Sequence, residues 1–377
     1  QVAEMLLRIT GGKALPHEVV AQIVAKTDGV PLFVEELTKM VLESGFLQEV
    51  DGRYELTGPL PAFAIPTTLQ DSLMARLDRL ATVKTVAQLG ATIGRQFPYE
   101  LLQAVALLDE ATVQQGLQQL VEAELLYQRG MIPQATYTFK HALIQDAAYQ
   151  SLLKSTRQQY HQRIAQALET RFPDVVETQP ELLAHHLTAA GLNGQAIPSW
   201  QRAGRRAYER SANLEAISHL SKGLETLTLL PDTPERTQHE LLLQTALGPA
   251  LMATKGYAAP EVERTCVRAR ELCQQIGDTR QLFPVLVGLW NFYFVRGVCQ
   301  TACEIGEQLL TLAQSDQDRR HLLRAHAALG EILFHTGQLI SARANLEQGT
   351  ALYDPVQHRS HAVQIPTVAC LAYAAWA

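Results

Sequence analysis

The chain has 377 residues, of which 47% are hydrophobic and 19% are charged, and its formal net charge is -6 at pH 7. This composition excludes a disordered chain, and the negative charge argues against a surface that binds nucleic acid generally. No apolar run reaches the roughly 18–20 residues of a membrane span and no signal peptide opens the sequence, so we expect a cytoplasmic protein without a membrane segment. The five cysteines fit reduced thiols, and the length fits roughly two or three domains.

The first 60 residues contain a corner between two predicted helices. Asp28-Gly29 is typical of a helix C-cap, because glycine adopts positive φ without a Cβ clash. Pro31 then suits the first turn of a new helix, in which apolar residues recur at three-to-four spacing over 32–41. Asp51-Gly52 predicts a β-hairpin turn shortly afterwards. From these residues alone, the corner also fits an ordinary helical bundle.

One short segment invites comparison with a phosphate-binding loop. Residues 10–14 contain a Gly-Lys pair, but such a loop needs G-x-x-x-x-G-K followed by Ser or Thr, since the hydroxyl binds Mg²⁺. Ala14 has no hydroxyl, and the residues before the loop follow a helical pattern. No Ser-His-Asp, Cys-His or paired-carboxylate arrangement can be defended from the spacing either. We therefore predict no catalytic residue in this chain.

Residues 67–171 have the pattern of a winged-helix-like domain. Helical patterns come first, and two strand patterns, 125–128 and 137–140, then flank a turn with Gly130 and Pro133. The helix before the strands, 111–124, carries four glutamines and neither lysine nor arginine. Because phosphate contacts dominate DNA affinity, we expect this domain to be structural and not to bind DNA.

From about residue 180 onward, small and apolar residues recur in the spacing of two-helix tetratricopeptide repeats. Gly204 and Gly330 each precede an alanine by 12 positions, and a leucine and a glycine follow that alanine after four and then three positions. Small residues let paired helices approach closely, and each repeat buries its open face only against its neighbours. We therefore expect a mainly α chain with three domains: a helical segment 1–60, a winged-helix-like domain 67–171 with a small β-hairpin, and an α-superhelix 180–377 truncated at its C-terminus.

Two groups of side chains in the repeats are candidates for binding a partner. The first is a basic stripe on one helix, formed by Arg202, Arg205 and Arg206. The second is an aromatic cluster, some of which must face the groove of a superhelix, formed by Trp290, Phe292, Tyr293 and Phe294. A solvated helix face is the alternative for the stripe. The cysteines sit at small-residue positions of the repeats and predict core packing, so we expect no metal site.

The segment 27–45 resembles the Gly-x-Pro segment in the helical lid of STAND-class signal-transduction ATPases. These are AAA-like switches, often fused in bacteria to class III nucleotide cyclases or LuxR-type activators. The run from Phe139 through His141 and Tyr149 to His161 resembles the segment that joins their winged helix to their superhelix. The resemblance implies that Gly29 and Pro31 contact the adenine of a bound nucleotide, with the proline packed near the base. It also implies that the repeats form a sensor.

The resemblance concerns a longer parent chain. We interpret these residues as a fragment, because position 1 is Gln and not Met and Ala377 follows a helical pattern that continues to the end. The parent would bind ATP or ADP with Mg²⁺, whereas this fragment alone would bind no cofactor. A protein or small-molecule inducer on the repeats would shift an ADP-closed to ATP-open equilibrium and switch an effector domain, for which a nucleotide cyclase is one candidate. Two alternatives stay open: a nucleotide-independent protein-interaction scaffold, and a winged-helix transcriptional regulator.

Overall fold

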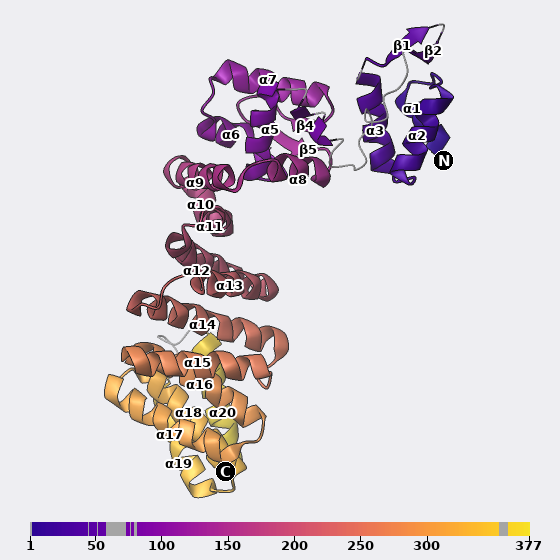
Figure 1. Cartoon of the computed structure of the whole chain (residues 1–377). Helices are drawn as coiled ribbons and strands as arrows, with labels where there is room; N and C mark the ends of the chain where they lie inside the picture. The colour runs from indigo at the N-terminus through magenta and orange to yellow at the C-terminus, as the bar shows by residue number, and fades with distance from the viewer. Residues whose placement is uncertain are drawn as a thin grey trace. The chain divides into compact units, whose positions relative to one another are not determined.

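The protein is mainly α-helical, as predicted, in a computed structural model whose elements are labelled in Figure 1. The structure describes residues 2–43, 45–50, 52–57, 73–75, 77–78, 81–353 and 361–377. Contacts between residues divide the chain into two compact units, Gln1–Phe172 and Pro173–Ala377. The first unit contains both segments that were predicted as separate domains, 1–60 and 67–171. The boundary expected between residues 60 and 67 lies outside the described residues.

Three helices and a hairpin share one core at the start of the first unit. They are α1 (Val2–Ile9), α2 (His17–Thr27), α3 (Pro31–Glu43), β1 (Leu47–Val50) and β2 (Arg53–Leu56). Each helix contributes buried apolar side chains, including Leu6, Ile23 and Leu37. The predicted hairpin is confirmed, because β1 and β2 pair antiparallel around Gly52, which has a φ of 77°.

The first unit continues with helices around a three-stranded sheet. The helices are α5 (Ala81–Ile93), α6 (Tyr99–Val105), α7 (Glu110–Glu122), α8 (Ala142–Gln150) and α9 (Lys154–Arg171). The strands are β3 (Gln96–Pro98), β4 (Leu126–Arg129) and β5 (Thr136–Phe139), and they pair antiparallel in the order β3-β5-β4. The two predicted strands are present as β4 and β5, whereas β3 was not predicted. Phe97 fixes β3 in place, since its ring is fully buried and stacks on Tyr137 of β5.

The second unit is a succession of antiparallel helices. They are α10 (Pro173–Thr178), α11 (Pro180–Ala189), α12 (Asn193–Glu209), α13 (Asn213–Leu227), α14 (Pro234–Lys255), α15 (Pro260–Ile276), α16 (Thr279–Val295), α17 (Cys299–Asp316), α18 (Arg319–His335), α19 (Leu339–Ala351) and α20 (His361–Trp376). Consecutive helices from α11 to α19 pack on one another, as Figure 1 shows for this unit. Within the described ranges of the chain, no helix combines the length and the apolar character needed to cross a membrane.

Glycines on the second helix of a pair bring the next helix into close contact. A Cβ on Gly223 would lie 2.9 Å from Leu243 Cδ2 of α14, and one on Gly349 would lie 2.8 Å from Cys370 Sγ of α20. Protein interiors are packed too densely to absorb such overlaps without a shift. The recurring small residues therefore set the spacing between successive helices, which is the architecture of tetratricopeptide-like repeats.

Candidate functional sites

The corner at Gly29 has the conformation expected from the sequence. Asp28 ends α2 with a φ of 49°, Gly29 follows with a φ of 75°, and Pro31 is the first residue of α3. Proline suits this position because the first helical turn needs no N–H donor. Gly29, Val30 and Pro31 are all exposed. The corner thus presents an apolar surface to solvent, as a contact for a flat apolar group would require.

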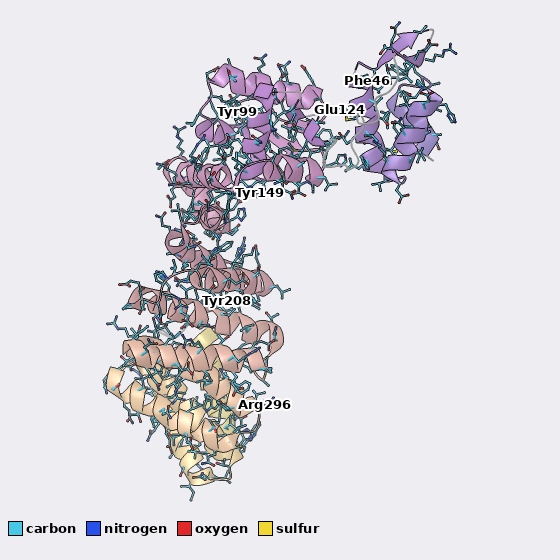
Figure 2. All side chains as sticks on the ribbon, viewed as in Figure 1. Phe46, Tyr99, Glu124, Tyr149, Tyr208 and Arg296 are labelled. Atoms are coloured by element: carbon cyan, nitrogen blue, oxygen red, sulfur yellow. The ribbon has the colours of Figure 1, made fainter. Side chains whose placement is uncertain are left out.

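Helix α3 is also connected by charges to the sheet-containing part of the first unit. Lys140, directly after β5, donates to Glu35 Oε1 at 2.7 Å and to Glu124 Oε2 at 3.2 Å. Lys39, one turn along α3, donates to Glu35 Oε1 at 2.8 Å and also pairs with Glu124, the residue labelled in Figure 2 just beyond α7. We call these four residues the α3 ion cluster. Three of its side chains are at most 22% exposed, so solvent screens it less than an ordinary surface pair.

The pKa of Glu35 distinguishes this cluster from an ordinary ion pair. Burial of Glu35 raises its pKa, but the hydrogen bonds from Lys140 and Lys39 outweigh that effect and hold the pKa at about 2. The hydrogen bond from Lys39 likewise lowers the pKa of Glu124. Both carboxylates therefore stay ionised at neutral pH and keep the two lysines bound.

The residues rejected as a phosphate loop have other bonding partners. Lys13 Nζ donates to Glu49 Oε2 of β1 at 2.6 Å, and Thr10 Oγ1 donates to the Leu6 carbonyl at 3.0 Å. Gly11 and Gly12 both have positive φ values where the chain leaves α1. This segment acts as the end of a helix, and its lysine is already neutralised.

The basic stripe on α12 divides between different environments. Arg206 Nη1 donates to the Glu177 carbonyl of α10 at 3.1 Å, whereas Arg202 is exposed. Arg205 lines a small hollow together with Gln201 and Tyr208. The three predicted residues therefore lie in different environments, and Arg205 is the one that lines this hollow.

The predicted aromatic cluster is largely internal. Trp290 and Phe292 are 2% and 4% exposed and belong to the core of the repeats. Tyr293 and Phe294 are partly buried against the same core, and Phe294 stacks on Trp290 with ring centroids 4.6 Å apart. The aromatic rings therefore pack α16 against the core of the repeats. Asn291, which lies between Trp290 and Phe292 in the sequence, lines a neighbouring cavity.

That cavity, which we call the repeat groove, has a volume of about 600 Å³. Its walls come from four helices: residues 244–252 of α14, 266–269 of α15, 280–291 of α16 and 320–324 of α18. It adjoins the hollow beside Arg205, because Thr245, Pro249 and Gln281 line both. The volume lies within the range of small-molecule sites, about 300–1,000 Å³.

The lining of the repeat groove combines cationic and apolar side chains. Its lining includes Arg280, Arg320, His321 and Arg324 but no aspartate or glutamate. Phe283 is one of the apolar lining residues, and its ring stacks on His321 with ring centroids 3.9 Å apart. Such a combination of an apolar wall with a few convergent polar groups is typical of ligand sites.

These cations were not predicted, because Arg280 lies on α16 whereas Arg320, His321 and Arg324 lie on α18, and the sequence does not show that the two helices line one cavity. A repeated sequence pattern could nevertheless have pointed to two of these cations, Arg280 and Arg320. Asp278 and Asp318 both cap a helix, and Arg280 and Arg320 each follow two positions later. The offset of 40 positions matches that between Ala302 and Ala342, so the pair recurs with the repeat.

Comparisons with known proteins give distant similarities. No protein-family model matches the chain. A protein of Rhizobium meliloti (strain 1021), described as uncharacterized, is 27% identical over 330 residues, covering 86% of this chain and 31% of its own length. The chain therefore spans about a third of the length of this curated relative.

Two solved structures are similar at low scores. One is a Signal Transduction ATPase with Numerous Domains (STAND) protein with a tetratricopeptide repeat sensor from Pyrococcus horikoshii, at 11% identity and a TM-score of 0.39, covering 99% of this chain and 62% of that one. The other is BtubC from P. vanneervenii, at 13% identity and a TM-score of 0.36, covering 78% of this chain and 96% of that one. Because both scores are below 0.5, the proposals below rest on the residues of this chain.

Proposed function

We propose that this chain is the regulatory and sensor part of a nucleotide-dependent signalling ATPase of the STAND type. The observation that carries the proposal is the position of α3 between two kinds of contact. Its first residue, Pro31, offers an exposed apolar ring at a Gly-x-Pro corner, and one turn later Glu35 begins the α3 ion cluster. A helix with a ligand-facing end and an ionic connection to the sheet-containing part of the same unit can transmit the state of a bound nucleotide.

In the longer parent protein, Gly29 and Pro31 would contact the adenine of ADP or ATP, with Mg²⁺ held by residues outside this chain. A change in that contact would move α3 and alter how Glu35 and Lys39 hold Lys140 and Glu124. The coupling that such an arrangement needs is modest, about 1–3 kcal/mol between the two sites. We assign no cofactor to the 377 residues themselves, because they contain no complete phosphate loop.

The repeats would supply the second input to this switch. An inducer bound in the repeat groove, or a protein bound along it, would favour one nucleotide state, and an effector domain of the parent chain would respond. A nucleotide cyclase is one candidate for that effector, and a cytoplasmic location fits all of these activities. Superhelices of helix pairs commonly bind partners on such concave surfaces.

A nucleotide-independent interaction scaffold is the second candidate function, and the repeat groove alone would satisfy it. A DNA-binding regulator is disfavoured by α7, where Gln118 donates to Glu122 at 2.9 Å and Gln114 donates to Glu110 at 3.1 Å. These glutamine side chains are uncharged and lie beside carboxylates, so they offer no cation to a phosphate backbone.

Hydrogen–deuterium exchange on the full-length parent protein, with and without ADP, tests the proposal. We expect ADP to slow amide exchange in residues 29–43 and also in 136–140, beyond the ion cluster. A Glu35→Gln variant should keep the first effect and lose most of the second. A scaffold without nucleotide dependence would show no change in either segment.

A further inference from the structure

We propose that the repeat groove binds a small organic anion, a molecule with an apolar or aromatic body and one carboxylate, sulfonate or phosphate group. This assignment gives a ligand class to the sensor and rests on the function proposed above for its regulatory meaning. The binding itself follows from the side chains that line the groove.

Arg324 provides the first argument for an anionic ligand. Its guanidinium Nη2 donates to Asn291 Oδ1 at 3.1 Å, and its guanidinium carbon lies 4.9 Å from the centre of the Trp290 ring. Both partners are neutral, and Arg324 forms no ion pair with any carboxylate in the part of the chain that the structure describes. Burial lowers the pKa of this arginine, which reflects the lost hydration of its charge. An anion in the groove would replace that hydration with a charge-assisted, two-pronged contact.

The charges around Arg324 leave the groove positive. Arg320 Nη2 pairs with Asp318 at 3.1 Å, and His321 Nδ1 lies 2.6 Å from Asp316, so these two are balanced by carboxylates outside the lining. Arg280 forms no ion pair among the described residues. Glu331 acts on Arg324 electrostatically but does not line the groove. Two cations, Arg280 and Arg324, thus line the cavity without an ion pair to a carboxylate among the described residues.

The apolar part of the lining explains why the ligand should have an apolar body. Met252, Phe283 and Val287 line it, and the stacked Phe283–His321 pair presents a flat surface. Burial raises the pKa of the Cys266 thiol to about 12, so this side chain is an uncharged, weakly polar part of the wall. A hydrated inorganic ion would leave this surface unused, whereas an aryl or alkyl group would bury it.

Two dyes that differ by one sulfonate provide the test on the 377-residue chain. 1-Anilinonaphthalene-8-sulfonate carries the charge, and N-phenyl-1-naphthylamine is its uncharged analogue. We expect the sulfonate to bind with saturation at one site and the neutral dye to bind at least about tenfold more weakly. Equal affinities, or binding of the sulfonate at several equivalent sites, would overturn the proposal, because either result indicates apolar binding alone.

Two variants and a matched control locate the site. Arg324→Gln should weaken sulfonate binding by at least about tenfold, since a charged hydrogen bond is lost. The double variant Arg280→Gln/Arg320→Gln alters exposed side chains at the rim and should also weaken binding severalfold with the fold intact. The control Arg264→Gln/Arg296→Gln removes the same charge from exposed positions outside the groove and should leave the affinity unchanged. If Arg324→Gln does not fold by circular dichroism, the rim variant decides: equal affinities for it and the control contradict the site.

The dye measurement is independent of the nucleotide switch. A chain that binds the sulfonate as described but belongs to a parent protein without ADP-dependent exchange would keep the ligand site and refute the STAND-type function. The reverse outcome would keep the switch and refute the ligand class.

Discussion

A Cβ atom on Gly204 of α12 would lie 2.4 Å from Leu220 Cγ of α13. The same relationship recurs further along the chain, where a Cβ on Gly330 of α18 would lie 2.6 Å from Leu346 Cγ of α19. In each pair the leucine follows the glycine by 16 positions and is fully buried. The first helix of a repeat therefore has a glycine where the leucine of its second helix packs, and two distant repeats share one packing rule.

Gly204→Ala should destabilise the repeats. Leu220 would have to move, and overpacking of this kind costs about 1–3 kcal/mol, partly offset by a gain of about 1 kcal/mol in helix propensity. The control is Gly194→Ala in the same helix, where an added Cβ meets no atom within 4 Å. Urea unfolding followed by circular dichroism should show a lower midpoint for Gly204→Ala and no loss for Gly194→Ala. Equal midpoints would contradict the assigned register.

The α3 ion cluster predicts an acid-dependent contribution to stability. The folded pKa of Glu35, about 2, lies below its unfolded value of 4.5, so its contribution is complete above pH 4.5 and is lost as the pH falls towards 2. Carboxyl NMR shifts measure this pKa directly. Lys140→Met should raise the Glu35 pKa towards its ordinary value, because the strongest of its hydrogen bonds is removed.

Lys13→Met is the matched control for that titration, since Lys13 pairs with Glu49 of the hairpin and is not part of the ion cluster. It should leave the Glu35 pKa where it is. A Glu35 pKa near 4 in the wild-type chain would show that α3 is not held by Lys140 in solution.

Glu331 predicts a pH dependence of the opposite sign. Burial raises its pKa to about 7 despite the opposing effect of Arg324, and Cys370 and Tyr373 of α20 also interact with this carboxyl. A folded pKa above the unfolded 4.5 means that the native state is favoured at low pH and penalised as the pH rises through 7. Glu331→Gln should therefore be more stable than the wild type at pH 8, by up to about 3 kcal/mol, and equally stable at pH 4.5.

Glu225→Gln, at an exposed position of α13, controls for loss of a surface carboxylate. Thermal melting of all three chains at pH 4.5, 6 and 8 provides the comparison. The burial of this charge would be contradicted if the difference in melting temperature between the wild type and Glu331→Gln did not change with pH.

Local chemistry explains which features the sequence predicted. The corner at Gly29 and the hairpin at Gly52 each depend on a glycine with positive φ, a requirement that is visible in neighbouring residues. Gly204 and Gly330 were equally visible, because the repeat places the same small residue at the same interval. β3 was not visible: it has three residues, ends in Pro98, and exists because Phe97 is buried against a strand 40 positions away.

The candidate site was harder to predict for a related reason. A run of arginines along one helix is easy to notice, yet Arg205 lines a small hollow, Arg206 donates to the Glu177 carbonyl and Arg202 is exposed. Arg280 of α16 and Arg324 of α18 line the same groove because the repeats pack on one another, which residue spacing within one helix cannot show. Some rings of the aromatic run on α16 were expected to face the groove, whereas Trp290 and Phe292 are buried in the core and Tyr293 and Phe294 are partly buried against it.

The most direct test of the nucleotide switch is the ADP affinity of the full-length parent protein carrying Pro31→Ala. The fold should be retained, since alanine can keep the first helical turn. The variant would lose the contact between the rigid proline ring and the adenine base of ADP. Losing about 1 kcal/mol of apolar contact weakens binding severalfold. Pro260→Ala is the matched control, because Pro260 also begins a helix, α15, far from the corner in sequence. We predict a severalfold higher Kd for ADP with an unchanged melting temperature in Pro31→Ala alone. An unchanged Kd with a lower melting temperature would show that Pro31 only starts a helix.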